Sequence, residues 1–197
     1  MKQLIITFLF IFSFTQSYAH KPVLNENSTY PADAPYEIEE PEISKAIYST
    51  LTGDPHYYRI QSDVDFDFYA GILAAKIGEC ALESKFSFEV LDAEFHNIDV
   101  ADGENFKWTP WYEEYGKQWY WNGPEIGKNF LSDRIYKAGT YYIKVFNSNN
   151  TGQYIMAVGD IEKFSFTDII GLIFSLGDIE DEFWDPNLCG LSLQESS

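Results

Sequence analysis

Aromatic side chains are concentrated in one stretch, residues 108–121, with the sequence WTPWYEEYGKQWYW. Flat aromatic rings beside carboxylates are what sugar rings require, because the apolar face of a pyranose stacks on a ring while its hydroxyls bond polar groups. Two interpretations stay open: the rings belong to the core, or some of them bind a glycan. The residues that would form this ligand-binding site are Trp108, Trp111, Tyr112, Tyr115, Trp119 and Trp121.

The carboxylates in this stretch also raise the question of catalysis. A glycosidase needs two carboxylates that flank the bond it cleaves, and Glu113 and Glu114 lie among the tryptophans. Adjacent residues of a strand point to opposite faces, so these two would not act as a pair. The sequence has no Gly-x-Ser-x-Gly elbow, His-Glu-x-x-His helix or phosphate-binding glycine loop. A non-enzymatic role is therefore favoured, and no catalytic residue is assigned.

The histidines suggest a second kind of chemistry. Cleavage of a signal peptide after Ala19 would make His20 the first residue of the mature chain. A terminal amine and the imidazole of the same residue can chelate copper, which prefers nitrogen ligands. His56 or His96 would then complete a histidine brace. The alternative is that His20 is an ordinary polar residue at a loose terminus.

Three aspartates, Asp63, Asp65 and Asp67, occupy every second position of a short stretch. On a strand this spacing places all three carboxylates on one face, where they would suit a calcium ion. The stretch lacks the glycine and the distal glutamate of an EF-hand loop. The alternative is a solvated strand face that alternates with the inward residues Val64, Phe66 and Phe68.

Cys80 and Cys189 are the two cysteines of the chain. An even number in a secreted chain favours a disulfide, which would tie the C-terminal segment to the middle of the protein. The alternative is two free thiols, with Cys80 buried. Neither cysteine has the setting of a catalytic nucleophile.

The segments that carry these residues begin with an expected secretory signal peptide, residues 1–19. It has a positive charge at Lys2, an apolar run that is too short to span a bilayer, and a small-x-small cleavage site ending at Ala19. We therefore expect a secreted protein that is periplasmic, extracellular or at the cell surface. Its formal charge of −18 repels phosphate backbones, which argues against nucleic acid as a partner.

The two ends of the mature chain differ from its middle. Residues 20–42 are rich in proline and acid, which predicts an extended, weakly structured lead. Residues 164–197 form a tail with an apolar run that predicts a short helix from about Asp168. This helix either packs on the domain or contacts a membrane or a partner groove. The acidic flank at residues 178–182 makes membrane contact the less favoured alternative.

The middle region, residues 43–163, has the pattern of a single β domain. Short runs rich in β-branched and aromatic residues predict strands at residues 56–60, 65–75 and 85–92, while residues 43–51 fit a helix or a strand. Turns separate the runs, and there is no alternation of strands with helices. The expected fold is an all-β, antiparallel, jelly-roll-like β-sandwich with a short C-terminal helix.

The clearest strand signal lies in residues 138–159, AGTYYIKVFNSNNTGQYIMAVG. Two alternating runs flank a polar loop, which predicts a β-hairpin. The alternation places one set of side chains from each run on one inward face. These sets are Tyr141, Ile143 and Val145 in the first run, and Tyr154, Met156 and Val158 in the second.

The order of YYRI, DFDFYAGIL, FSFEVLD and this last stretch resembles the bacterial pre-peptidase C-terminal domain over residues 44–160. Such domains are small sandwiches that accompany secreted enzymes, so the resemblance implies an accessory role. His20, Lys21 and Pro22 also resemble the start of a group of secreted proteins with no assigned activity. We therefore expect a non-catalytic module that recognises an extracellular glycan or protein partner, with copper binding as the alternative.

Overall fold

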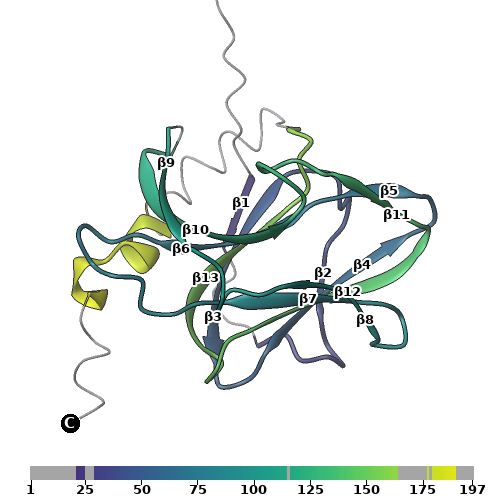
Figure 1. Ribbon diagram of the computed structural model, residues 1–197, viewed down its shortest axis with the longest axis horizontal. Coiled ribbons are helices and arrows are strands. Elements are labelled where there is room, and N and C mark those ends of the chain that lie inside the picture. The colour runs from purple at the N-terminus through teal and green to yellow at the C-terminus, as the bar shows by residue number, and fades with distance from the viewer. Residues whose placement is uncertain (1–20, 25–28, 115, 164–176, 178, 190–197) are drawn as a thin grey trace, which may run out of the picture.

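The computed structural model describes residues 21–24, 29–114, 116–163, 177 and 179–189. These residues form two β-sheets that pack face to face, as Figure 1 shows. The expected all-β sandwich is confirmed. The predicted signal peptide, residues 1–19, and His20 lie outside the described residues, as does residue 115.

The larger sheet has six strands in the order β1-β3-β13-β6-β10-β9. Neighbouring strands in this sheet are antiparallel, except that β1 runs parallel to β3. The strands are β1 (Lys21–Leu24), β3 (Lys45–Thr52), β6 (Ala70–Ala75), β9 (Thr109–Glu113), β10 (Gln118–Ile126) and β13 (Thr151–Val158).

The smaller sheet has five strands in the order β2-β4-β12-β7-β8, and β2 runs parallel to β4. A two-stranded ribbon of β5 and β11 lies beside the two sheets. The bounds are β2 (Tyr36–Glu37), β4 (His56–Ser62), β7 (Ser87–Leu91), β8 (Asn97–Ala101) and β12 (Gly139–Phe146), with β5 (Phe66–Phe68) and β11 (Arg134–Tyr136) in the ribbon.

The described part of the lead, residues 21–24 and 29–42, has more structure than its composition predicts. β1 adds an edge strand to the larger sheet and β2 adds one to the smaller sheet. Tyr30 and Ile38, which lie on either side of β2, are buried in the core. Prolines suit these positions because an edge strand or a loop can leave one side of its backbone without ladder hydrogen bonds. The lead is therefore part of the domain.

The prediction of a hairpin at residues 138–159 is wrong. β12 pairs with β4 and β7 in the smaller sheet, whereas β13 pairs with β3 and β6 in the larger sheet. The connecting loop crosses between the sheets, and the Asn147 side chain closes it with hydrogen bonds to the backbone N–H and C=O of Thr151 at 3.1 and 2.7 Å. The inward faces are as predicted, since Ile143, Val145 and Met156 are fully buried.

Two apolar clusters lie on the two faces of the larger sheet. The first fills the space between the sheets and includes Ile47, Ile60, Ile72, Phe88, Val90 and Met156. The second lies on the outer face, where Tyr48, Leu73 and Ile155 are covered by Ile179 and Phe183 of the C-terminal segment. The central strands of the larger sheet, β3, β13 and β6, are therefore buried on both faces.

The covering segment is helical at residues 177 and 179–183, and the short 3₁₀ helix η1 (Pro186–Leu188) follows it. Ile179 and Phe183 are four residues apart and so lie on one face of this helix, the face that packs on the sheet. The start predicted at Asp168 lies outside the described residues. Among the residues that the structure describes, no helix has the length and apolarity needed to cross a membrane.

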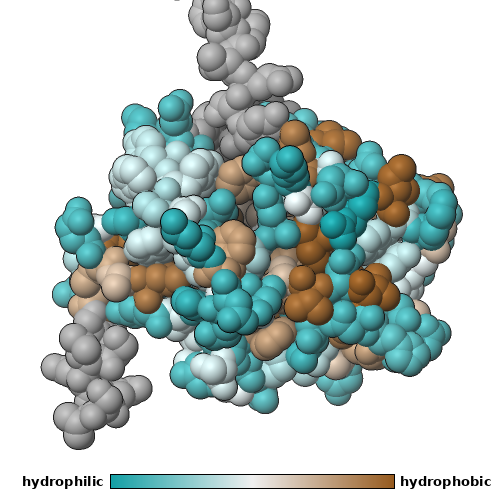
Figure 2. All heavy atoms as spheres, viewed as in Figure 1, coloured by the Kyte–Doolittle hydropathy of each residue, from teal (hydrophilic) through white to brown (hydrophobic). Residues whose placement is uncertain are grey.

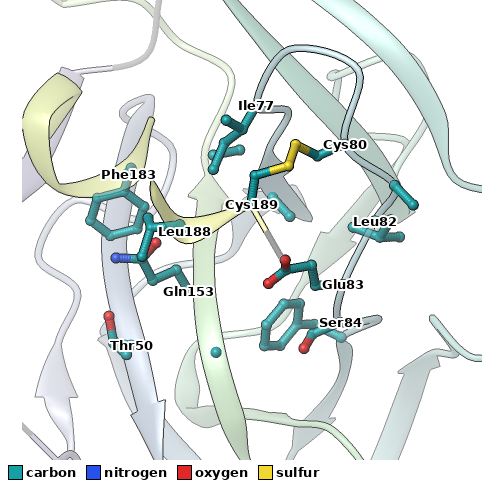
Figure 3. Close-up of a pocket in the computed structure, with 15 residues that line it drawn as sticks. Thr50, Ile77, Cys80, Leu82, Glu83, Ser84, Gln153, Phe183, Leu188 and Cys189 are labelled. Atoms are coloured by element: carbon teal, nitrogen blue, oxygen red, sulfur yellow. A yellow bond between two sulfur atoms is a disulfide. The ribbon is translucent and has the colours of Figure 1, made fainter. Parts of the chain in front are cut away.

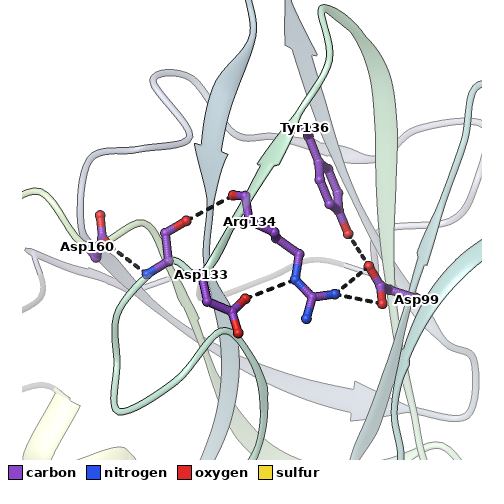
Figure 4. A network of polar contacts seen from close by, with 6 residues as sticks. Asp99, Asp133, Arg134, Tyr136 and Asp160 are labelled. Atoms are coloured by element: carbon purple, nitrogen blue, oxygen red, sulfur yellow. Dashed lines mark hydrogen bonds and ion pairs between the residues drawn. The ribbon is translucent and has the colours of Figure 1, made fainter.

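A polar network fastens the edge strand β8 to β11, as Figure 4 shows. Nη1 of Arg134 donates to both carboxylate oxygens of Asp99, at 2.8 and 2.9 Å, and the Tyr136 hydroxyl donates to Asp99 at 2.7 Å. Hydrogen bonds to Asp133 and Asp99 raise the pKa of Arg134. The edge of the smaller sheet is thereby held against the ribbon.

Hydrophilic side chains dominate the face of the molecule seen in Figure 2, and the hydrophobic ones on it form scattered groups. Exposed large hydrophobic residues of the described chain include Val64, Val100 and Ile135. Single apolar side chains on a surface are normal and need no partner.

Candidate functional site

The aromatic stretch forms a two-stranded hairpin, β9 and β10, at one edge of the larger sheet. The register pairs Tyr112 with Trp119 and Trp111 with Tyr120. Directly paired residues of an antiparallel ladder share a face, and adjacent residues alternate. Tyr112 and Trp119 therefore lie on one face of the hairpin, and Trp111 and Tyr120 lie on the other.

The face with Trp111 and Tyr120 anchors the hairpin. The Trp111 ring packs against those of Tyr120 and Phe130, at centroid distances of 5.6 and 4.9 Å. The Tyr120 ring contacts Trp184 at 5.1 Å, and its hydroxyl lies 3.0 Å from the hydroxyl of Tyr48. Burial raises the pKa of Tyr48 to about 12. This face belongs to the cluster under the C-terminal helix, so its aromatic residues are structural.

The opposite face presents its rings to solvent. Trp119 is 47% exposed and Tyr112 is 40% exposed, and their ring centroids lie 5.1 Å apart. The backbone beneath them is well fixed, because the carbonyl oxygen of Trp119 accepts hydrogen bonds from the Lys76 N–H and from Nε1 of Trp184, both at 2.9 Å. We call Tyr112 and Trp119 the aromatic face.

Lys76 brings a positive charge to the aromatic face. Its ammonium group lies 6.0 Å from the centre of the Trp119 ring and 5.7 Å from that of Trp121, within the range of a cation–π interaction. The same group donates a hydrogen bond to the carbonyl oxygen of Gly78. An ammonium group has three N–H donors, so donors remain for a ligand.

The other residues predicted for this site have different roles. Trp108 is buried, its Nε1 donates to the carbonyl oxygen of Gly103 at 2.9 Å, and its ring packs over Gly123. Trp121 is half-buried and packs against the cluster between the sheets. Tyr115 lies outside the described residues. The sequence located the aromatic stretch, but the strand register was needed to separate exposed rings from buried ones.

The histidines lie in separate places. His56 is fully buried, with Nδ1 2.8 Å from the Tyr154 hydroxyl and 3.2 Å from Oγ of Ser49. Burial lowers the pKa of His56 to about 4. His96 is exposed on the turn between β7 and β8, where its Nδ1 lies 3.2 Å from Oδ2 of Asp92.

The register of β1 bears on the predicted copper brace. Lys21 pairs with Lys45, whereas Ser49, the hydrogen-bond partner of His56, lies four residues further along β3. At the rise of a strand, this separation is about 13 Å. The described residues therefore give no support to a brace that includes His56. His20 lies outside them, and copper binding by His20 stays a prediction.

The structure does not bring the three predicted calcium ligands together. Asp63 and Asp65 precede β5, which begins at Phe66. Asp65 is engaged by Lys137, whose Nζ lies 2.7 Å from its carboxylate, and by the backbone N–H of Ala138 at 3.0 Å. These hydrogen bonds lower the pKa of Asp65. Asp63, Asp65 and Asp67 are all exposed, and Phe66 and Phe68 are buried, as the solvated-face alternative requires. The prediction that Val64 is buried is wrong, because Val64 precedes β5 and is 68% exposed.

One other group of potential metal ligands exists in the described part of the chain. Oxygen and nitrogen atoms of Asp92, Glu94 and His96 lie within 4.8 Å of one another. Oδ1 of Asp92 already accepts the backbone N–H groups of Glu94 and His96, at 3.0 and 2.8 Å. The group is therefore explained as the closure of the turn between β7 and β8.

The two cysteines form a disulfide, as predicted. Cys80 lies in the segment between β6 and β7, and Cys189 follows η1 near the C-terminus. The Cα atoms are 6.0 Å apart, and the residues are separated by 109 positions in the sequence. The bond ties the C-terminal segment to the end of the sandwich.

No protein-family model matches the sequence, and no curated protein matches it. Similar solved structures include the pre-peptidase C-terminal domain of a collagenase from Bacillus anthracis, at 12% identity and a TM-score of 0.36, with 68% of this chain and 97% of that chain covered. The catalytic domain of a GH87 alpha-1,3-glucanase in complex with nigerose is 10% identical, at a TM-score of 0.30, with 61% of this chain and 22% of that chain covered. Similarity at this level says nothing about what this chain binds.

Proposed function

We propose that this chain is a secreted, non-catalytic binding module whose aromatic face, Tyr112 and Trp119, binds a glycan with the help of Lys76. The observation that carries the proposal is a hairpin with one face buried and two large rings exposed on the other. Apolar rings stack on the apolar faces of sugars. Because the backbone of the hairpin is fixed by Lys76 and Trp184, little ordering cost accompanies binding.

The charge of the protein favours a neutral glycan. At a formal charge of −18, a polyanionic sugar would be repelled before it reached the surface. The ammonium group of Lys76 can donate hydrogen bonds to the hydroxyls of a neutral sugar that stacks on Trp119. A neutral polysaccharide is therefore the expected ligand class.

The position of the nearest carboxylates supports a binding role over a catalytic one. Glu113 pairs with Gln118 and shares the buried face of the hairpin with Trp111. Its Oε2 accepts the backbone N–H of Gly116, so it helps to close the turn. A pair of carboxylates that flanks one glycosidic bond would need both groups on the face that holds the sugar.

The disulfide between Cys80 and Cys189 supports the secreted part of the proposal. Disulfides persist in the periplasm and outside the cell, and they are rare in the reducing cytosol. A signal peptide at residues 1–19 would take the chain to such a compartment.

Affinity electrophoresis through gels that contain a neutral polysaccharide tests the proposal. Laminarin, xyloglucan, mannan and soluble starch form the panel, and at least one should retard the protein. Trp119→Ala and Tyr112→Ala should each weaken that binding by about tenfold to a hundredfold, as for aromatic residues at the centre of an interface.

Phe95→Ala is the matched control, because Phe95 is 43% exposed and also stacks on another ring, that of Tyr142 at 4.4 Å. It lies on the smaller sheet and should leave the retardation unchanged. Equal binding by the wild-type protein and both hairpin variants would refute the proposal, and so would a wild-type protein that no polysaccharide of the panel retards.

A further inference from the structure

A cavity of about 300 Å³ opens at the end of the sandwich beside the disulfide, as Figure 3 shows. It lies where β6 and β13, neighbours in the centre of the larger sheet, separate from each other. Their pairing ends at Leu73 and Ile155. Beyond that point β6 remains paired with β10 as far as Ala75, and β13 remains paired with β3 back to Thr151. The gap between two central strands forms the cavity.

Small and apolar side chains line most of this space. Several of them are alanine or glycine, whose side chains are too small to fill the gap between the strands. The lining includes Ala74, Ala75, Leu82, Phe86, Gly152 and Phe183. An empty apolar gap of this size lacks van der Waals contacts between its walls, and the separated strands form no ladder hydrogen bonds with each other there.

Two segments far apart in the sequence close the cavity. One is the connection from β6 to β7, which contains Cys80, and the other is the C-terminal segment that ends at Cys189. The disulfide joins them, and Nε2 of Gln153 donates to the carbonyl oxygen of Glu182 at 3.1 Å, which ties β13 to the helix. The two segments that form this wall of the cavity are therefore held together by a covalent bond.

The polar groups of the lining are few and mainly uncharged. The side chains of Thr50 and Ser84 both lie away from the disulfide in Figure 3, on opposite sides of β13. Neither hydroxyl has a hydrogen-bond partner among the described residues. Glu83 is the charged residue of the described lining, which contains no lysine or arginine.

We propose that this cavity binds a neutral, mainly apolar small molecule that carries a hydroxyl or carbonyl group. The volume suits a ligand of about fifteen non-hydrogen atoms, near the lower end of small-molecule sites. The apolar walls would bury its body, and the hydroxyl of Ser84 would bond its polar end. Glu83 and the formal charge of −18 disfavour an anion. The site is distinct from the aromatic face.

Fluorescence titration of the whole mature protein with N-phenyl-1-naphthylamine tests this proposal. This probe is neutral, of about the required size, and brighter in apolar surroundings. We expect saturable enhancement at one equivalent, with a Kd of about 100 μM or tighter. Ala81→Trp places a large side chain at an exposed alanine of the lining and should weaken probe binding at least tenfold.

Ala93→Trp is the matched control, because Ala93 is an equally exposed alanine on the distant turn between β7 and β8. It should leave probe binding unchanged. Ser84→Phe, which fills the opposite end of the cavity, should repeat the loss seen with Ala81→Trp. Unchanged binding in both cavity variants, or no saturable binding to the wild-type protein, would overturn the proposal.

Trp119→Ala separates this proposal from that of the glycan site. It should weaken polysaccharide binding by about tenfold to a hundredfold and leave probe binding intact. Loss of probe binding in Trp119→Ala would place the probe on the aromatic face and would also overturn the cavity as its site.

Discussion

Nδ1 of His56 lies 2.8 Å from the hydroxyl of Tyr154, and this contact joins the two sheets inside the sandwich. His56 begins β4 of the smaller sheet, and Tyr154 belongs to β13 of the larger sheet. The Tyr58 hydroxyl lies 2.5 Å from that of Tyr154, and Oγ of Ser49 lies 3.2 Å from the same imidazole nitrogen. We call Ser49, His56, Tyr58 and Tyr154 the buried polar cluster.

Tyr154→Phe should destabilise the protein by about 1–3 kcal/mol, because it removes the hydroxyl that forms hydrogen bonds with buried His56 and Tyr58. Urea denaturation of the two proteins measures the difference. Tyr141→Phe is the control, since the Tyr141 hydroxyl donates to the carbonyl oxygen of Lys137 near the surface. Equal losses in the two variants would show that the cluster has no special role.

Acid should weaken the fold through His56. Burial lowers the pKa of His56 to about 4, whereas the unfolded chain takes up the proton near the ordinary value of 6.5. Between these values the unfolded state binds more protons, so the free energy of unfolding should fall as the pH drops from 6.5 towards 4. The fall is at most about 1.4 kcal/mol per pH unit for one group.

Thermal unfolding at several pH values between 7 and 4.5 measures this dependence. His56→Gln should flatten the curve in that window, because glutamine does not titrate. A curve with the same slope in His56→Gln would assign the acid sensitivity to other groups.

Replacement by alanine should lower the stability of the protein much more at one tryptophan of the aromatic stretch than at another. Trp108→Ala should cost about 3–5 kcal/mol of stability, because it removes a buried ring and its hydrogen bond to Gly103. Trp119→Ala should cost less than about 1 kcal/mol, since Trp119 is 47% exposed at the edge of the sheet. Guanidinium denaturation compares the two, and a large loss in Trp119→Ala would mark that residue as structural.

The disulfide should contribute substantially to stability. It closes a loop across 109 positions, so its loss restores much conformational freedom to the unfolded chain. The double variant Cys80→Ser, Cys189→Ser should lose about 2–4 kcal/mol, read as a lower guanidinium midpoint. Wild-type protein kept in reductant should behave in the same way. A midpoint that is unchanged in both would mean that packing alone holds the C-terminal segment.

Patterns within short segments of the sequence were sufficient to predict the inward residues of the strands, the disulfide and the fold class. Alternation identified the inward residues Ile143, Val145 and Met156, because successive side chains of any strand point to opposite faces. The even number of cysteines predicted the bond between Cys80 and Cys189. The spread of short strands predicted a sandwich.

The sequence by itself determined which residues lie inward and which class of fold results; only the tertiary structure decided which strands meet. The same alternation fits β12 and β13 as a hairpin or as members of two sheets, because pairing depends on contacts distant in sequence. For the same reason only the register of β9 and β10 showed Trp119 to be exposed and Trp111 to be partly buried. The interior position of His56 likewise follows from packing between sheets.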